Sequence, residues 1–167
     1  MRIPHKRFPW LLTLCIVFIL PPVQAEQSSF TEIPALSDSS LLKATINAAG
    51  NVIVGTQNAS AFRWTKADGI QKLGTINNQK VDTYATAVNA AGDMIVGYGS
   101  DIITHQYQAL IWTQSGSIQS LGTLNGGYTS RATGINADGN VIVGYANDGS
   151  ISGTAAIRAF RWTATEG

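Results

Sequence analysis

Eleven residues of this chain occur three times with few changes. The copies read INAAGNVIVGT at residues 46–56, VNAAGDMIVGY at 88–98 and INADGNVIVGY at 135–145. Their asparagines, Asn47, Asn89 and Asn136, are 42 and 47 residues apart. Self-similarity at a period of roughly 20–50 residues is typical of repeat proteins, in which each unit buries its apolar face against the next. The chain is therefore expected to fold as stacked copies of one small unit.

A second segment recurs with each copy and carries a tryptophan. The tryptophans are 48 and 50 residues apart, and an apolar residue precedes each by two positions. The pairs are Phe62 and Trp64, Leu110 and Trp112, and Phe160 and Trp162. A buried aromatic residue removes roughly 150–250 Å² of surface from water, so we expect these residues to anchor each unit on its neighbour. A ring of tryptophans facing a sugar or another hydrophobic ligand is the alternative interpretation.

Each unit is predicted to contain four short antiparallel strands. The first leads into a turn of the form Asn-Ala-x-Gly, where the asparagine can bond the local backbone and the glycine can adopt positive φ. These turn residues are Asn47, Asn89 and Asn136 with Gly50, Gly92 and Gly139. The second strand is the run that follows the turn, the third carries the tryptophan, and the fourth has the pattern Ile-Gln-x-Leu-Gly-Thr. Beyond the first 25 residues, no segment has the 3.6-residue apolar period of a helix.

Four antiparallel strands in about 40–50 residues are the pattern of a β-propeller blade. The sequence therefore predicts an all-β protein of about three tandem four-stranded antiparallel blades, a partial β-propeller. Stacked blades cover both faces of an inner strand, which explains why Val52-Ile53-Val54 is apolar throughout. Because propellers usually have about 4–8 blades, we expect either further repeats of a longer chain or self-association through open blade edges. A β-solenoid with the same period is the alternative architecture.

The first 25 residues differ from the rest. A basic start precedes an apolar stretch from Phe8 to Leu20, which two prolines and a small residue, Ala25, follow. This is the layout of a secretory signal peptide, and the stretch is shorter than the ~20 residues that a membrane-spanning helix needs. We predict a signal peptide at 1–25, with a retained anchor as the alternative. The mature part, 26–167, is predicted to hold repeats at about 30–65, 66–113 and 114–167, with an isolated fourth-type strand at 30–36.

The composition of the mature part limits its chemistry. The one cysteine of the chain, Cys15, lies in the leader, so no disulfide or thiol chemistry is expected after it. From Glu26 onward there are eight Lys and Arg side chains and ten Asp and Glu side chains. A slightly acidic chain lacks the basic patch that binding of nucleic acid or of an acidic membrane surface requires. We therefore expect no nucleic-acid partner.

The sequence predicts no catalytic, cofactor or metal site. After the leader the chain has one histidine, His105, which lies in a polar insert at residues 100–108. A single histidine without cysteine does not make a typical transition-metal site, and no residues resemble the strand–turn–helix motif of a serine nucleophile. The carboxylates that stand out are scattered over predicted turns: Asp68, Asp93, Asp138 and Asp148. Turn chemistry accounts for them, so we predict a protein that is not an enzyme.

The repeated motifs resemble the extracellular repeats of the HAF family, which is named for a His-Ala-Phe tripeptide. The matching pieces are Ala159-Phe160-Arg161-Trp162, Leu121-Gly122-Thr123-Leu124 with Gly126-Gly127, and Gly134-Ile135-Asn136 through to Val143-Gly144. The resemblance covers nearly all of the mature part. The family's histidine is replaced by Ser60, Gln108 and Arg158, so a role tied to it is not expected here. The resemblance implies a secreted or surface protein of a Gram-negative bacterium, with some relatives preceding an autotransporter barrel.

These observations lead to one expected function and two alternatives. We expect a secreted or cell-surface, non-catalytic repeat module that binds an unknown extracellular ligand, as part of an autotransporter-type surface protein outside the cell or in the periplasm. The variable inserts at residues 98–108 and 145–157, which tyrosines flank, are the predicted place for a binding surface. The alternatives are a fragment of a secreted propeller enzyme that acts on glycans and a purely structural spacer.

Overall fold

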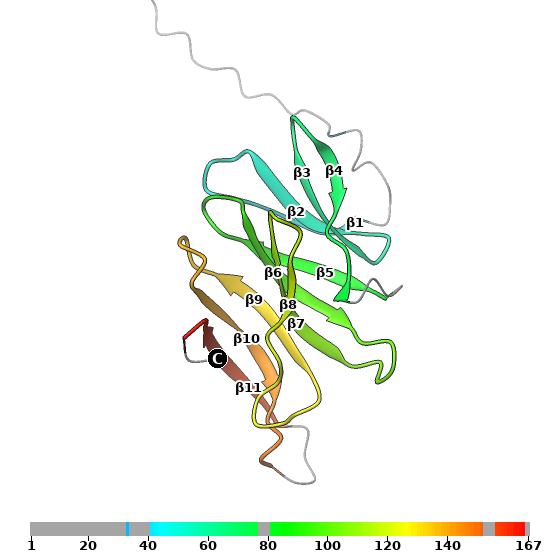
Figure 1. The fold of residues 1–167 in the computed structure, drawn as a ribbon, viewed down its shortest axis with the longest axis vertical. Helices are drawn as coiled ribbons and strands as arrows, with labels where there is room; N and C mark the ends of the chain where they lie inside the picture. The colour runs from blue at the N-terminus through cyan, green and yellow to red at the C-terminus, as the bar shows by residue number, and fades with distance from the viewer. Residues whose placement is uncertain (1–32, 34–40, 77–80, 152–155, 166–167) are drawn as a thin grey trace, which may run out of the picture. The chain divides into compact units, whose positions relative to one another are not determined.

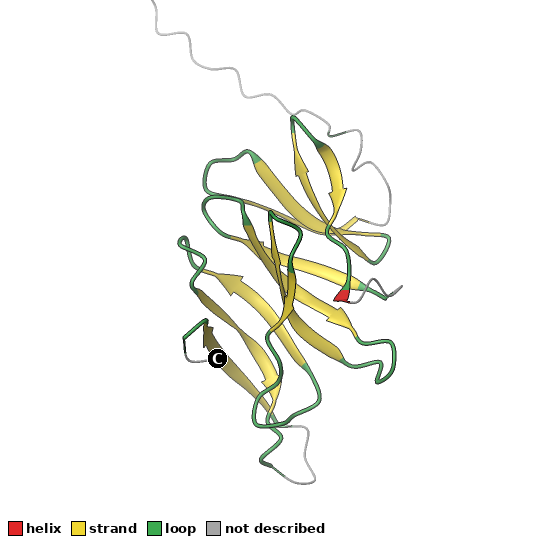
Figure 2. Cartoon of the chain, in the orientation of Figure 1, coloured by secondary structure: helices red, strands yellow, loops and turns green. Residues whose placement is uncertain are grey.

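The chain forms three small antiparallel β-sheets (Figures 1 and 2). The computed structural model describes residue 33 and residues 41–76, 81–151 and 156–165, which all belong to one compact unit. The all-β prediction is confirmed for these residues, whose eleven elements are all strands. The predicted signal peptide and, apart from Ile33, the predicted strand at 30–36 lie outside them. Across the described part of the chain, no helix is long and apolar enough to cross a membrane.

The sheets follow one another along the chain, and neighbouring strands are adjacent in sequence. Sheet 1 contains β1 (Leu41–Ile46), β2 (Val52–Gln57), β3 (Ser60–Thr65) and β4 (Gly69–Lys72). Sheet 2 contains β5 (Thr83–Val88), β6 (Met94–Ser100), β7 (Tyr107–Thr113) and β8 (Ile118–Ser120). Sheet 3 contains β9 (Ser130–Ile135), β10 (Val141–Asn147) and β11 (Ile157–Thr163). The four-strand unit is thus present twice, and the third copy has three strands among the described residues.

Equivalent residues lie on equivalent faces of the three sheets. In sheet 1, Ile53 pairs with both Ile46 and Trp64, so the three side chains share one face. We call this the tryptophan face; in sheet 2 it carries Val88, Ile95 and Trp112, and in sheet 3 it carries Ile135, Ile142 and Trp162. The opposite face, which we call the valine face, carries Val54, Val96 and Val143 in the three sheets in turn.

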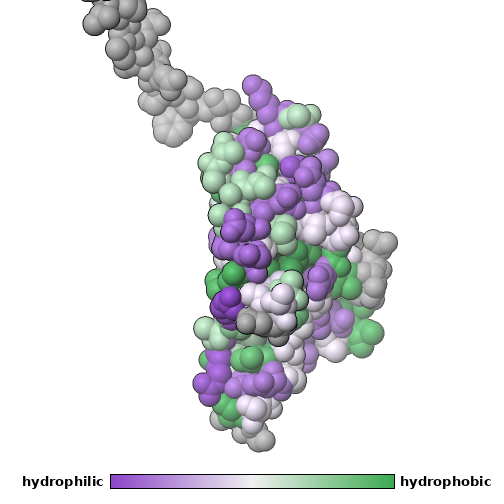
Figure 3. Space-filling model, turned by 60° about the vertical axis from the view of Figure 1, so that its left-hand side comes forward, coloured by the Kyte–Doolittle hydropathy of each residue, from purple (hydrophilic) through white to green (hydrophobic). Residues whose placement is uncertain are grey.

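The sheets pack valine face on tryptophan face. One core cluster joins Val52, Val54 and Ala61 of sheet 1 to Ala85, Ile95, Leu110 and Trp112 of sheet 2. The other joins Val96, Ala109 and Ile111 of sheet 2 to Ala132 and Ile142 of sheet 3. Sheet 2 is therefore covered on both sides, which is the physical reason that β6 has buried residues on both of its faces, Ile95 and Val96. Elsewhere hydrophobic residues reach the surface among hydrophilic ones (Figure 3).

The second strand of every sheet has a glycine because the first strand comes too close for a side chain. A Cβ added to Gly55 would lie 2.1 Å from the carbonyl oxygen of Lys43, and one added to Gly97 would lie 1.9 Å from that of Tyr84. Gly144 has the same relation to Arg131, at 2.1 Å. Each first strand also has a register shift near this point, as expected of a β-bulge. The repeated Val-Gly dipeptide thus places the bulge that bends each sheet.

The Asn-Ala-x-Gly turns are built by the asparagine side chains. The Oδ1 atoms of Asn47, Asn89 and Asn136 accept hydrogen bonds from the first backbone N–H groups of the following strands, at 3.0, 3.1 and 2.9 Å. The turn glycines Gly50, Gly92 and Gly139 have φ values of 72°, 80° and 81°, which other L-residues rarely adopt. Asn47 also reaches the next repeat, since its Nδ2 donates to the carbonyl oxygen of Ala90 at 3.0 Å.

A hydroxyl group accepts a hydrogen bond at each junction between sheets. The backbone N–H of Ala61 donates to Thr83 Oγ1, and that of Ala109 donates to Ser130 Oγ, both at 2.9 Å. Thr83 and Ser130 occupy equivalent positions, each six residues before the turn asparagine. The junction between sheets 1 and 2 therefore repeats between sheets 2 and 3 in its apolar core and in this hydroxyl contact.

Candidate binding site

The three tryptophans have the same place in each repeat but different surroundings. Trp112 is 1 % exposed and belongs to the core between sheets 1 and 2, where its Nε1 donates to the carbonyl oxygen of Gly74 at 3.3 Å. Trp162 is half-buried at the edge of the core between sheets 2 and 3. Trp64 is also half-buried. Since Trp112 lies between two packed sheets, the three rings do not form a common ligand-binding face.

The apolar residues that precede the tryptophans by two positions also differ in burial. Leu110 and Phe62 are buried, whereas Phe160 is half-buried at the core between sheets 2 and 3. The six turn residues, Asn47, Asn89, Asn136, Gly50, Gly92 and Gly139, shape backbone turns, as described above. The shared apolar residues of sheets 2 and 3 thus belong to the cores between the sheets, and the shared turn residues shape the backbone. A binding site has to be sought where the repeats differ.

Four tyrosines and an arginine gather where sheet 2 meets sheet 3. The rings of Tyr84 and Tyr98 stack with centroids 4.8 Å apart, and Tyr107 meets Tyr98 edge to face at 5.4 Å. The Arg131 guanidinium carbon lies 4.6 Å from the ring centroid of Tyr107 and 5.0 Å from that of Tyr98. Its Nη1 donates to the hydroxyl oxygen of Tyr145 at 3.2 Å. We call these five residues the Tyr–Arg cluster.

The cluster comes from positions at which the repeats differ. Tyr84 and Arg131 both lie five residues before the turn asparagine, where the first repeat has Leu42. Tyr98 and Tyr145 both lie nine residues after it, where the first repeat has Thr56. The cluster is therefore not a property of the repeated unit. Among the described residues it arises once, at the junction between sheets 2 and 3.

Burial and neighbouring charges shift the pKa of two of the tyrosines, Tyr84 and Tyr98. Burial and the nearby carboxylate of Asp82 raise the pKa of Tyr84 to about 12. Burial also raises the pKa of Tyr98, although the Arg131 cation opposes that shift. Both groups are neutral at physiological pH and keep their hydroxyl hydrogens as donors. Arg131 Nε is buried and has no hydrogen-bond partner among the described residues, so one donor of the cation remains unused in a partly aromatic surrounding.

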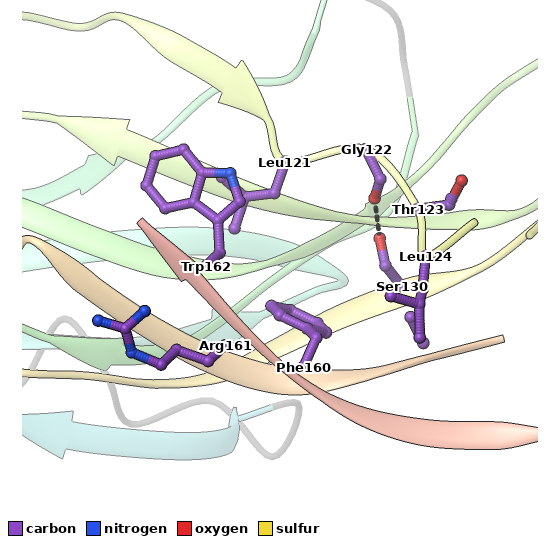
Figure 4. A pocket seen from close by; sticks show the side chains of 9 residues that line it. Leu121, Gly122, Thr123, Leu124, Ser130, Phe160, Arg161 and Trp162 are labelled. Carbon is purple, nitrogen blue, oxygen red and sulfur yellow. Dashed lines mark hydrogen bonds between the residues drawn. The ribbon is translucent and has the colours of Figure 1, made fainter. Parts of the chain in front are cut away.

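A small pocket lies on the same junction, between the segment after β8 and sheet 3 (Figure 4). Its volume is about 100 Å³, and its walls are mainly apolar, with the rings of Phe160 and Trp162 and the side chains of Leu121 and Leu124. Ser130 Oγ donates to the carbonyl oxygen of Gly122 at 2.5 Å and so uses its hydrogen within the wall. A smaller pocket of about 50 Å³ lies at the equivalent place between sheets 1 and 2. The pocket is thus a gap that the repeat leaves at each junction.

The carboxylates singled out from the sequence are separate and serve turns. Asp68 Oδ2 accepts from Thr65 Oγ1 at 2.8 Å, Asp93 Oδ1 accepts from Asn89 Nδ2 at 2.7 Å, and Asp138 is exposed. His105 is also exposed, in the turn before β7. Across the part of the chain that the structure describes, no group of three His, Cys, Asp or Glu residues could hold a metal ion.

Asp148 is the most enclosed carboxylate of the described residues. Ser150 Oγ, Asn125 Nδ2 and Arg158 Nε donate to it at 2.6, 3.0 and 2.8 Å. These bonds, with that of Ser150 the strongest, hold the pKa of the Asp148 carboxyl well below its usual range. The group therefore stays ionised and ties the turn at Asn125 to the loop after β10. This environment is the opposite of what a general acid needs.

Sequence reasoning located the cluster in part. The inserts at 98–108 and 145–157 were predicted to carry the variable surface, and Tyr98, Tyr107 and Tyr145 lie at their ends. It missed Tyr84 and Arg131, because both lie inside a first strand and nothing local marks them. The signal that could have found them is the alignment of the repeats, in which Leu42, Tyr84 and Arg131 share one position.

In comparisons with known proteins, no family model matches this sequence, and no curated protein matches it significantly.

Proposed function

We propose that this protein is an exported, non-catalytic β-repeat module of a bacterial surface, which binds a glycan at the Tyr–Arg cluster. Two kinds of sequence observation support export: the three-part leader at 1–25 and the resemblance to HAF repeats. The binding function rests on the cluster itself. Its residues lie at positions where the repeats differ, and they meet at the junction between sheets 2 and 3. The shared apolar residues of sheets 2 and 3 pack in the cores instead.

The chemistry of the cluster favours a sugar. Pyranose rings present C–H groups that pack on aromatic rings, and hydroxyl groups that pair with phenolic and guanidinium groups. The cluster offers both kinds of contact, and Tyr145 is 38 % exposed at its edge. The positive charge of Arg131 favours an acidic sugar over a neutral one.

We also propose that the stacked sheets are blades of a β-propeller. In the described residues, β5 contacts β1, β2 and β3, and β9 contacts β5, β6 and β7. The first strand of a sheet thus lies against the middle of the preceding sheet, as it would at the inner edges of converging blades. A solenoid would stack equivalent strands on one another instead. The packing of a valine face on a tryptophan face fits either architecture. The position of each first strand against the middle of the preceding sheet favours the propeller.

A glycan array tests the proposed binding. The purified chain is expected to bind uronic-acid or other acidic glycans, and Tyr107→Ala and Arg131→Gln are expected to weaken that binding at least tenfold. Tyr128→Ala is the matched control, because Tyr128 is exposed and lies outside the cluster; its binding should not change. Circular dichroism of each variant checks that the fold persists. Equal binding by all four proteins, or no binding by the natural chain, would contradict the proposal.

A further inference from the structure

Two faces of the stack have no described sheet on them. The first is the valine face of sheet 3, where Val143 is 46 % exposed and Ile157 is 66 % exposed. The second is the tryptophan face of sheet 1, where Ile46 is 54 % exposed. The equivalents of Val143 in the other sheets, Val54 and Val96, are both 0 % exposed. The described sheets therefore expose part of one face of each type: the residues around Val143 on sheet 3, and Ile46 on sheet 1, where Phe62 of the same face is buried.

The internal junctions show what covers such faces. Val54 shares a core cluster with Val88, and Val96 shares one with Ile135, so a valine face is covered each time by the tryptophan face of the next repeat. Ile46 is the residue of sheet 1 that is equivalent to Val88 and Ile135. The open face of sheet 3 thus has the same chemistry as two faces whose partner is known. Sheet 1 of a second copy carries a tryptophan face of this kind, with Ile46 at the position of Val88 and Ile135.

We propose that two copies of this chain associate head to tail, so that the valine face of sheet 3 in each copy packs on the tryptophan face of sheet 1 in the other. The two junctions are identical and are related by a two-fold axis, which closes a ring of six sheets. Head-to-tail contacts form a closed ring when the rotation between units permits it. Six sheets, from the three that are described in each copy, fall within the range of about 4–8 blades. The inference holds whether or not the Tyr–Arg cluster binds a glycan.

Polar contacts at the junction between sheets 1 and 2 indicate which donors and acceptors could meet at the new one. Asn47 Nδ2 donates to the carbonyl oxygen of Ala90, and Arg63 Nε donates to that of Gly92, at 3.0 and 3.4 Å. Asn136 and Arg161 are the equivalent donors on sheet 3. They would meet the carbonyl oxygens of Ala48 and Gly50 in the second copy, which are the equivalent acceptors on sheet 1.

The turn glycine supplies a steric match. Gly92 lies so close to Val52 that an added Cβ would be 2.5 Å from its Cγ2, and Gly139 has the same relation to Met94, at 2.6 Å from its Sδ. Nothing lies within 4 Å of an added Cβ at Gly50. Val141 is equivalent to Val52 and Met94, so it is the residue on which Gly50 of the second copy would rest. The hydrogen bond that the hydroxyl groups of Thr83 and Ser130 accept has no equivalent at the new junction, because the first repeat has Leu41 at their position.

Sedimentation equilibrium of the purified chain gives the first test. We expect a mass of two chains that dissociates on dilution, and we expect Val143→Glu and Ile46→Glu each to yield single chains with unchanged circular dichroism. Gln119→Glu is the control, because Gln119 is exposed on β8 in sheet 2. A single-chain mass at every concentration would overturn the proposal, and so would a mass of three or more chains.

Cysteine cross-linking tests the direction of packing. The variants Ile46→Cys and Val143→Cys are made separately in a chain whose Cys15 is absent or replaced. Under oxidation, a mixture of the two is expected to give a disulfide-linked pair of chains, whereas either variant alone is expected to give none. A cross-linked pair from Val143→Cys alone would mean that like faces meet, and would overturn the head-to-tail arrangement even if the mass is that of two chains.

Discussion

Sheet 2 and sheet 3 are built from nearly the same residues, yet their burial differs. Val96 is 0 % exposed in sheet 2, and its equivalent in sheet 3, Val143, is 46 % exposed. Trp112 is buried, and Trp162 is half-buried. The residues are matched, so the difference comes from the neighbours: sheet 2 has a sheet on both faces, and sheet 3 has one among the described residues. The repeated unit therefore specifies two faces but can satisfy them only in a stack.

Replacement of the tryptophans should give the largest effect in this comparison. Trp112→Ala is expected to lower the free energy of unfolding by about 3–5 kcal/mol, as for other buried aromatic residues. Trp64→Ala should cost only about 1–2 kcal/mol in the dilute single chain, because less of its surface is buried. Urea denaturation followed by circular dichroism measures both. Equal losses would contradict the claim that sheet 2 is the covered one.

The turn glycines offer a second, smaller contrast. Alanine at Gly50 should cost roughly 1–2 kcal/mol, because φ is positive there and nothing crowds the added Cβ. Alanine at Gly92 should cost about 1–3 kcal/mol more, since its Cβ would also collide with Val52 of the preceding repeat. Thermal unfolding of the two variants side by side gives the difference. A loss at Gly50 as large as that at Gly92 would mean that the turn does not seat on the preceding sheet.

Much of the fold could be predicted from the sequence because repetition carries the information. The triplicate turn and tryptophan segments predicted strands and turns, and the unbroken apolar run at Val52-Ile53-Val54 predicted a strand covered on both sides. In the structure Val52 and Val54 are buried, while Ile53 is half-buried on the tryptophan face of sheet 1, on which no described sheet packs. Whether Ile53 is covered depends on whether another sheet packs on its face, and the local sequence does not encode that.

The candidate site was harder to predict for a related reason. Arg131 and Tyr84 belong to different sheets and lie 47 positions apart in the sequence, and they come together only because sheet 3 packs on sheet 2. Each is unremarkable in its own strand. Asp148 shows the same limit, since its bonds to Asn125, Ser150 and Arg158 depend on a loop whose path no turn motif fixes.

Methyl NOE spectroscopy tests the stacking of the three sheets most directly. The account predicts contacts from the methyl groups of Val54 to those of Ile95 or Leu110, and from Val96 to those of Ile142. Both sets should appear in one spectrum of the folded chain, and each should persist at the lowest protein concentration. If either set is missing while the strands of each sheet remain intact, the sheets do not cover one another in the way described, and the stacked arrangement is wrong.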